Sequence, residues 1–247
     1  MSEALDVLIR QADKKKALLG IKEPPTPEKE DAYQESFLIA SIYNSLAIEG
    51  NSLTQAEIER ILTKDEVIAG KSLSDHLSVI GCRRAIMLAR QYSRAKVRIG
   101  EHEIRKLHNH MINGQQEGGG EYRSYNLMVR DRRPTTYEKI GDKMHELAED
   151  YNSLEHEHPI EVAAFFHLRI AKIHPFSDGN GRIGRLVTNI VLETAGYPAV
   201  IFPYDQKDRY YDALESYDGL KGNPDTEPMK IFLAGLVDHQ LDELLAL

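Results

Sequence analysis

A short loop between two helical patterns constrains the fold of this chain more than any other stretch. In AKIHPFSDGNGRIGRLVTN, residues 171–189, a proline follows His174 and two glycines precede Arg182. Proline cannot continue an α-helix, so the first helix is predicted to end near His174. The second helix is predicted to begin near Arg182, where helical spacing of apolar residues resumes. The sequence therefore places a histidine at the mouth of a tight turn between two helices.

The glycines and the second helix start favour an anion site. Gly179 and Gly181 can adopt positive φ and expose backbone N–H groups. A helix N-terminus adds unsatisfied donors and the positive end of the helix dipole. Arg182 and Arg185 are three residues apart, so their side chains share one helix face. Two guanidiniums beside such a nest suit a polyphosphate better than a single carboxylate.

Two further residues of the loop bring reactive chemistry to this anion site. Asp178 supplies an oxygen ligand of the kind that Mg²⁺ uses when it accompanies polyphosphates. His174 has a reference pKa near ~6.5 and can accept a proton at neutral pH. Together these groups predict phosphoryl or nucleotidyl transfer. The alternative, an ordinary DGNG turn flanked by surface arginines, is weaker because all of these groups occur at once.

The rest of the chain reads as mostly helical. Thr54 and Glu57 form a capping-box pattern that opens one helix, and EPPTPEKE is expected to be a linker. A glycine-rich lead-in at 114–120 precedes a short β-hairpin flap, predicted around 122–134. The fold class is therefore mainly α. The other helices are predicted over residues 3–20, 31–49, 72–95, 101–113, 137–153, 159–173, 182–195, 206–218 and 226–245.

Composition narrows the class of protein. Hydrophobic residues make up 41% of the 247 residues, which is enough for a packed core. The net charge of −8 disfavours general nucleic-acid binding. Cys82 is the only cysteine, so no internal disulfide forms and a reducing compartment is expected. We see no signal peptide and no apolar run of roughly 18 residues, so we expect a cytoplasmic protein without a membrane anchor.

The motif HPFSDGNGRIGR, residues 174–185, resembles the Fic-domain signature H-P-F-x-[DE]-G-N-G-R-x-x-R at every fixed position. The resemblance extends from about residue 45 to the C-terminus and includes GEYR and RYYDAL. It implies a Fic-type helical bundle with a β-hairpin flap over the active-site loop, and a catalytic core over residues 63–247 after an N-terminal helical region, 1–62. Most Fic proteins transfer AMP from ATP to a hydroxyl side chain of a target protein and release pyrophosphate.

The resemblance also implies roles for individual residues. His174 looks like the general base that deprotonates the target Ser, Thr or Tyr, and Asp178 looks like the Mg²⁺ ligand. The residues that would bind the phosphates of ATP are Gly179, Asn180, Gly181, Arg182 on the β-phosphate side and Arg185 at the γ-phosphate. Such preorganised donors stabilise the charge of a loose transition state.

A second motif, NSLAIEGNSLT at residues 44–54, suggests control of this site. Ser45 and Glu49 are four residues apart on a predicted helix, and Glu49 lies near its C-terminal end, where the dipole disfavours a carboxylate without a cationic partner. The segment resembles the Fic inhibitory motif [S/T]-x-x-x-E-[GN], in a helix at about 31–50. The resemblance implies that Glu49 pairs with Arg185, removes the γ-phosphate clamp and keeps the enzyme off.

The same resemblance extends to the adenine and the target. Tyr211 is expected to line the adenine pocket. Asp218 stands where relatives often carry asparagine, which leaves the choice of nucleotide open. An extended flap edge could pair with a target segment through main-chain bonds, although an ordinary hairpin is an equal alternative. The flap residues expected to dock the target are Tyr122, Arg123, Met128 and Val129.

Several other interpretations remain. The same site could remove AMP from a modified protein, with Glu49 aligning a water molecule. The chain could also be a nucleotide-binding regulatory module without turnover. A nuclease is disfavoured because HNH at residues 108–110 lacks supporting metal ligands, and a DNA-binding regulator is disfavoured because few residues follow Arg185. We expect a protein target, a possible homodimer and no nucleic-acid partner.

Overall fold

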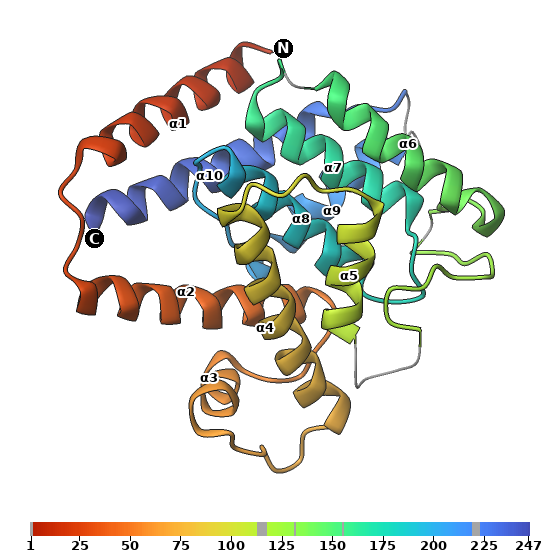
Figure 1. Ribbon diagram of the computed structural model, residues 1–247, viewed down its shortest axis with the longest axis horizontal. Coiled ribbons are helices and arrows are strands. Elements are labelled where there is room, and N and C mark those ends of the chain that lie inside the picture. Colours follow the sequence, from red (N-terminus) through yellow and green to blue (C-terminus); the bar gives the residue numbers. More distant parts are fainter. Residues whose placement is uncertain (1, 113–117, 131, 155, 219–222) are drawn as a thin grey trace.

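The structure is a computed structural model that describes residues 2–112, 118–130, 132–154, 156–218 and 223–247. These residues form α-helices and two single 3-10 turns (Figure 1). The elements are α1 (Glu3–Ile21), α2 (Pro27–Ile48), α3 (Gln55–Lys64), α4 (Leu73–Arg94), α5 (Glu101–Ile112), η1 (Tyr137–Lys139), α6 (Ile140–Ser153), α7 (Pro159–Ile173), α8 (Asn180–Thr194), η2 (Tyr204–Gln206), α9 (Lys207–Asp218) and α10 (Glu227–Ala246). The connection between α5 and η1 is the longest of those between the elements. The mainly helical class is confirmed.

Local signals at the helix starts behave largely as expected. The capping box of Thr54 and Glu57 opens α3, with both reciprocal hydrogen bonds present. The linker predicted over residues 23–30 is too long, because α2 already begins at Pro27. Proline is tolerated at the first helical position, where its missing N–H would have no partner, and the Thr26 side chain caps the turn.

The core is built around α7 and α8, which pack side by side at the centre of the molecule (Figure 1). α8 also packs against α4, and α4 against α5. The apolar residues that these helices share are fully buried, Phe166 on α7 and Val187 on α8 among them. Since the predicted anion loop joins α7 to α8, the loop is held by the two most enclosed helices of the fold.

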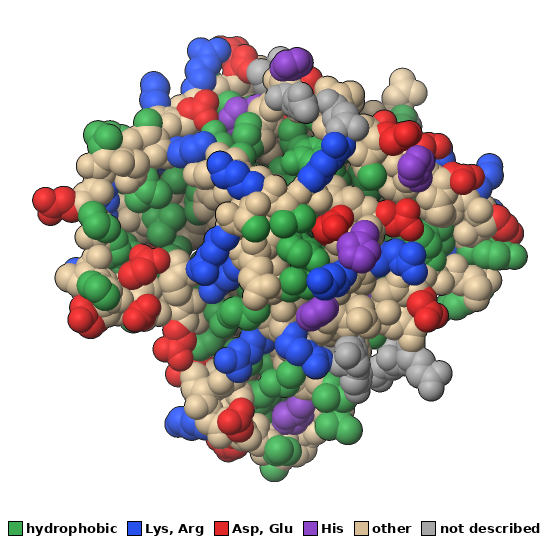
Figure 2. Space-filling model, in the orientation of Figure 1, with side chains coloured by type: hydrophobic (Ala, Val, Ile, Leu, Met, Phe, Trp, Pro, Cys, Tyr) green, Lys and Arg blue, Asp and Glu red, His purple; other side chains and the backbone are tan. Residues whose placement is uncertain are grey.

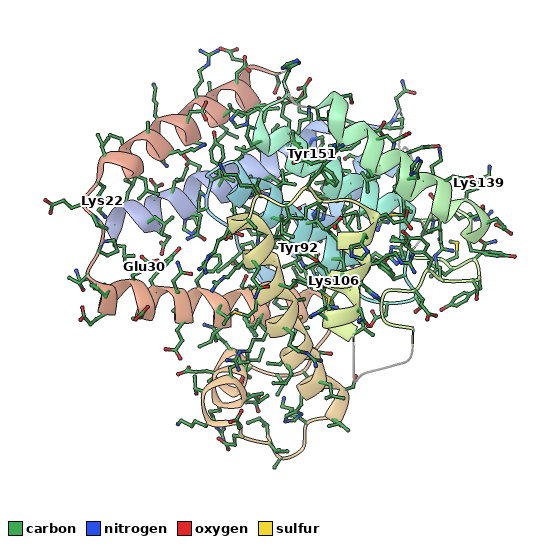
Figure 3. The ribbon with its side chains drawn as sticks, in the orientation of Figure 1. Lys22, Glu30, Tyr92, Lys106, Lys139 and Tyr151 are labelled. Atoms are coloured by element: carbon green, nitrogen blue, oxygen red, sulfur yellow. The ribbon has the colours of Figure 1, made fainter. Side chains whose placement is uncertain are left out.

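Helix α1 lies against α10 on one side of the molecule, and the connection from α1 leads into the long helix α2 (Figure 1). Two lysines of this region donate to carbonyls at helix C-termini: Lys16 Nζ to Ala195 O at 2.7 Å, and Lys22 Nζ to Leu245 O at 2.8 Å. Figure 3 labels Lys22 in the α1–α2 connection. Cations at helix C-termini are stabilising, so these contacts attach α1 to the C-terminal ends of α8 and α10.

The predicted β-hairpin flap is wrong as a hairpin. In the described part of residues 122–134 there is no β-strand, only an isolated antiparallel bridge between Val129 and Arg132. We call residues 122–135 the flap segment. Its backbone pairs elsewhere, since Arg123 N donates to Pro175 O at 2.9 Å and Thr135 N donates to Lys172 O at 3.0 Å.

A buried arginine explains why the flap segment does not form a ladder. The guanidinium of Arg123 donates to the carbonyls of His174 and Tyr125, at 2.8 and 2.6 Å, and also to Thr135 O. Acceptors that a hairpin would use between its strands are therefore taken by one side chain. Part of the glycine-rich lead-in, residues 114–117, lies outside the described residues.

The surface carries charges of both signs. On the face shown in Figure 2, lysine and arginine side chains alternate with acidic ones, and hydrophobic side chains show between them. Such scattered apolar exposure is normal for a folded domain. Among the described helices, none combines the length and the apolar character that a bilayer-spanning segment needs.

Candidate active site

His174 lies at the C-cap of α7 in a strained conformation. Its φ of 50° is left-handed, which is uncommon for residues other than glycine, and its N–H still donates to Ile170 O at 2.8 Å. The loop is held in this conformation by Arg123, which binds the carbonyl of His174 through its side chain and that of Pro175 through its backbone N–H. Strain of this kind persists only where the surroundings enforce it, and it is common at functional sites.

The loop itself is closed by Asn180. Its side-chain oxygen accepts from Phe176 N at 2.9 Å, and its amide nitrogen donates to Phe176 O at 2.7 Å. Phe176 is fully buried. The side chain of Asn180 therefore closes the loop with its oxygen and one of its two amide N–H groups.

The anion nest begins earlier than the sequence suggested. α8 starts at Asn180 rather than near Arg182, after Gly179 takes a φ of 77° at the N-cap. The carboxylate of Glu49 lies so close to Gly181 that a Cβ at this position would collide with it. An anion of this chain therefore already occupies the N-terminal end of α8, where a phosphate would be favoured.

The two arginines of the motif have different partners. Arg185 Nη2 donates to Glu49 Oε1 at 2.7 Å and to Ser45 O at 3.0 Å, and Arg185 Nε donates to Ser45 Oγ at 3.0 Å. Arg182 Nη2 instead donates to Asp178 Oδ2 at 2.7 Å. Both guanidiniums are buried, whereas the Glu49 side chain is 35% exposed. The structure thus brings the two predicted inhibitory residues onto one of the two predicted phosphate-binding arginines.

A chain of buried side chains orients Arg185, and the sequence did not reveal it. Thr188 Oγ1 donates to a carbonyl one turn back, so it accepts from His167 Nδ1 at 2.9 Å. His167 Nε2 then accepts from the Tyr210 hydroxyl at 2.9 Å, and Arg185 Nη1 lies 3.5 Å from that oxygen. Burial, together with the charge of Arg185, lowers the pKa of His167 to about 3, so it stays neutral.

A second histidine also escaped the sequence analysis. His108, from the HNH stretch, is buried and stacks on Phe176 at 3.7 Å between ring centroids. Gly120 N donates to its Nδ1 at 2.9 Å, so Nε2 carries the hydrogen and donates to Asp178 O at 3.0 Å. Burial lowers its pKa to about 4. His108 therefore fixes the loop against α5. In the sequence, the only signal of this role was the position of His108 on the apolar face of a predicted helix.

His174 faces a cavity of about 140 Å³. Burial, followed by the charges of Arg132 and Arg123, lowers the pKa of His174 to about 4, so its imidazole is neutral at pH 7 and able to accept a proton. Arg182 does not line this cavity. The residues that do are Glu49, Val129, Arg130, Arg132, His167, Ala171, His174, Asn180, Gly181, Gly184, Arg185, Tyr210, Tyr211 and Leu214.

The residues predicted for the adenine and the target have different surroundings. Tyr211 lines the cavity, and the Arg130 guanidinium covers its ring at 3.6 Å from the centroid. Val129 also lines the cavity, whereas Met128 is 56% exposed. Tyr122 packs against Phe176 and points its hydroxyl into the protein.

Asp178 is the predicted metal ligand. Its side chain is 56% exposed, and its oxygens accept from Gly179 N at 2.6 Å and from Arg182. Desolvation raises its pKa, but Arg182 and the Gly179 N–H outweigh it and hold the pKa below the usual value, so the carboxylate is ionised. No group of three His, Cys, Asp or Glu suited to a metal occurs in the described part of the chain. A single accessible carboxylate fits Mg²⁺ that arrives with a polyphosphate, because Mg²⁺ commonly keeps water and phosphate ligands.

A helical core that presents a histidine, an anion nest and a basic side chain around one loop defines the Fic class of domain. Residues 98–192 match the model of the Fic/DOC family, and the chain belongs to this family. The chain is 32% identical over 242 residues to Protein adenylyltransferase Fic of Drosophila virilis. The matched region covers 95% of this chain and 48% of that relative.

Solved structures agree with this assignment. The fold is similar to that of a Fic-domain-containing signaling protein from Bacteroides thetaiotaomicron, with a TM-score of 0.86, 27% identity and 96% of each chain covered. It is also similar to Fic-1 from C. elegans, with a TM-score of 0.84, 25% identity, and 98% of this chain and 71% of that one covered. The chain spans less than half the length of the curated relatives that it matches.

Proposed function

We propose that this chain is a protein adenylyltransferase, which moves AMP from ATP to a Ser, Thr or Tyr hydroxyl of a target protein and of itself. The observation that carries the proposal is the convergence of His174, the N-terminal end of α8 and Arg185 on one cavity. The name of the Drosophila virilis relative supports the same reaction.

In the proposed reaction the neutral imidazole of His174 takes the proton of the target hydroxyl as the oxygen attacks the α-phosphorus of ATP. The bond from this phosphorus to the bridging oxygen breaks, and pyrophosphate leaves with the electron pair. Donors at the start of α8 and the guanidinium of Arg185 stabilise the charge on the phosphate oxygens. Asp178 would hold Mg²⁺, which neutralises part of the phosphate charge when it is bound.

The resting enzyme in this proposal is inhibited by its own N-terminal region, residues 1–62, acting on a catalytic core over 63–247. The carboxylate of Glu49 competes with the γ-phosphate of ATP for Arg185 and for the start of α8. The half-exposed position of Glu49 supports a reversible contact, because water and ions can replace it. The exposed Met128 and the cavity-lining Val129 are candidates for contact with the target.

The decisive experiment uses α-labelled ATP, Mg²⁺ and three proteins: wild type, Glu49→Gly and Glu49→Gly/His174→Ala. We expect Glu49→Gly to incorporate label about 10²-fold faster than wild type, since a donor to the transition state is regained. The double variant should bind ATP without transferring it. Glu35→Gly is the matched control, because Glu35 is an exposed glutamate of the same helix. Absence of label from Glu49→Gly would contradict the proposal.

A second reaction at the same site is favoured by one observation, namely that Glu49 lines the same cavity as His174. In that reaction Glu49 would align a water molecule that removes AMP from a modified protein. The two reactions predict opposite effects of Glu49→Gly, which should speed AMP addition and slow AMP removal. Assays of the same variant in both directions separate them.

A further inference from the structure

Three charged side chains meet at a buried point behind the flap segment. Asp218, the last residue of α9, accepts from Arg132 Nη1 at 2.7 Å and from Lys172 Nζ at 3.2 Å. These residues come from α9, the flap segment and α7, and we call them the Asp218 cluster. The side chains of Asp218 and Arg132 are only 5% and 9% exposed. The cluster therefore ties three elements together, with Asp218 and Arg132 buried and Lys172, 39% exposed, on its solvent side.

Because Asp218 is buried, its negative charge, and not only its hydrogen bonds, matters to the cluster. A carboxylate removed from water needs compensating cations, and here each oxygen has its own, Arg132 at Oδ2 and Lys172 at Oδ1. A neutral amide at this position would leave the buried guanidinium of Arg132 without a counter-charge. The cluster as built carries one net positive charge rather than two.

The cluster also borders the candidate general base. Arg132 lines the same cavity as His174, and Lys172 precedes His174 by two residues at the end of α7. Two charged groups of the flap segment, Arg132 and Arg123, oppose protonation of His174. Glu49, at the end of α2, favours it, and so does a backbone hydrogen bond within α7. Asp218 accepts a hydrogen bond from one of these groups, Arg132.

The geometry points to Asp218 as a positioning residue that holds the guanidinium of Arg132 beside His174 and offsets part of its positive charge there. This inference rests on the proposed function, in which His174 takes the proton of the target hydroxyl. Asp218 does not line the cavity, so it acts through Arg132 rather than on the substrate. Without it, an uncompensated guanidinium would face the imidazole and make His174 a weaker base.

A purely structural role for the cluster leads to a different expectation. If Asp218 served only to fasten the flap segment to α9, its loss would lower thermal stability and leave the proton affinity of His174 unchanged. If it also sets the field at His174, removal of Asp218 and removal of Arg132 should move that proton affinity in opposite directions. The sign of the shift therefore separates the two roles.

The test is a titration of the His174 ring by NMR, with the signal assigned by its absence in His174→Ala. Arg132→Gln should raise the midpoint by about one pH unit, as expected for loss of a close like charge. Asp218→Asn should lower it, and Asp218→Glu should keep it near the wild-type value. Asp212→Asn is the matched control, because it removes the same charge from an exposed position of the same helix.

An unchanged midpoint in Arg132→Gln would overturn the inference, as would equal midpoints in Asp218→Asn and Asp212→Asn. If Asp218→Asn does not fold, the double variant Arg132→Gln/Asp218→Asn decides, because its midpoint should equal that of Arg132→Gln if Asp218 acts only through Arg132, and a different midpoint would overturn the inference. The titration needs neither ATP nor target. A shifted midpoint together with no AMP transfer by Glu49→Gly would therefore refute the proposed function and leave the coupling between Arg132 and His174 standing.

Discussion

Two segments cover the same cavity with opposite charge. The C-terminal end of α2 brings the carboxylate of Glu49 to the buried guanidinium of Arg185. The flap segment brings the guanidinium of Arg132 to the buried carboxylate of Asp218, and that of Arg130 to the ring of Tyr211. Each covering thus contains an ion pair that links the covering segment to a charge held inside the core.

The two ion pairs differ in their access to water. In the α2 contact one partner, Glu49, is 35% exposed, whereas both partners of the flap contact are nearly excluded from solvent. A solvated pair contributes little to stability and exchanges readily, while loss of one partner from a buried pair leaves an uncompensated charge. The difference suggests that the α2 contact can be displaced by a ligand and that the flap contact maintains the fold.

The largest effect is expected from the arginine on which the α2 contact acts. In the Glu49→Gly background, Arg185→Met should reduce AMP transfer by about 10²–10³-fold, as for loss of one transition-state donor. Initial rates with α-labelled ATP measure it. Arg94→Met, an exposed arginine at the end of α4, should leave the rate unchanged. Full activity of Arg185→Met would mean that Glu49 does not block a catalytic group.

The stability of the two contacts can be compared directly. Arg132→Met should lower the free energy of unfolding by about 3 kcal/mol, because it leaves the buried Asp218 with only the more distant Lys172 as a counter-charge. Glu49→Gln should lower it by less, about 1 kcal/mol, since water reaches the exposed side of the contact and Arg185 keeps its hydrogen bonds to Ser45. Urea denaturation of both variants measures the losses. Equal losses would remove the distinction between the two coverings.

His108, the buried histidine that holds the loop against α5, should make stability depend on pH. The pKa of His108 is about 4 in the folded protein and near ~6.5 when unfolded, so the unfolded state binds more protons between these values. The free energy of unfolding should therefore fall as pH drops from about 6.5 to about 4, by on the order of 2 kcal/mol at pH 5 from this residue. Denaturation at pH 7 and pH 5 tests this, and His108→Gln should show a shallower dependence.

The smallest effect is expected from the hydroxyl that supports the α2 contact. Ser45→Ala removes one hydrogen bond to Arg185, worth about 1 kcal/mol. With Glu49 intact, this should raise AMP transfer roughly fivefold by weakening inhibition. Ser41→Ala, one turn earlier on α2, serves as the control. If the two variants transfer AMP equally fast, Ser45 does not contribute to the contact.

The helices were largely predictable from the sequence because their signals are local. Pro175 ended α7, Thr54 with Glu57 opened α3, and apolar spacing located most of the others. The conformation of the flap segment was not predictable. Its alternating pattern predicted a hairpin but could not show that the Arg123 side chain would bind backbone carbonyls that a hairpin would need for its own hydrogen bonds. The start of α2 at Pro27 was missed because proline also ends helices.

The candidate site also has a part that was predictable from the sequence and a part that was not. The loop from His174 to Arg185 could be identified from residue types and spacing alone. The histidines that support it could not, because His167 meets Tyr210 across 43 positions and His108 meets Asp178 across 70. A helical pattern shows that such a residue is on an apolar face but not which polar group it will meet there.

The sequence by itself determined the helices, the sharp turn after α7 and the anion nest at the start of α8, because backbone sterics and capping act within a few residues. Only the tertiary structure decided which charges meet over the cavity. Glu49 reaches Arg185 from 136 positions away, and Arg132 reaches Asp218 from 86. Long-range pairs of this kind depend on how whole helices pack, since a buried charge requires an opposite charge and only the packing decides which residue supplies it.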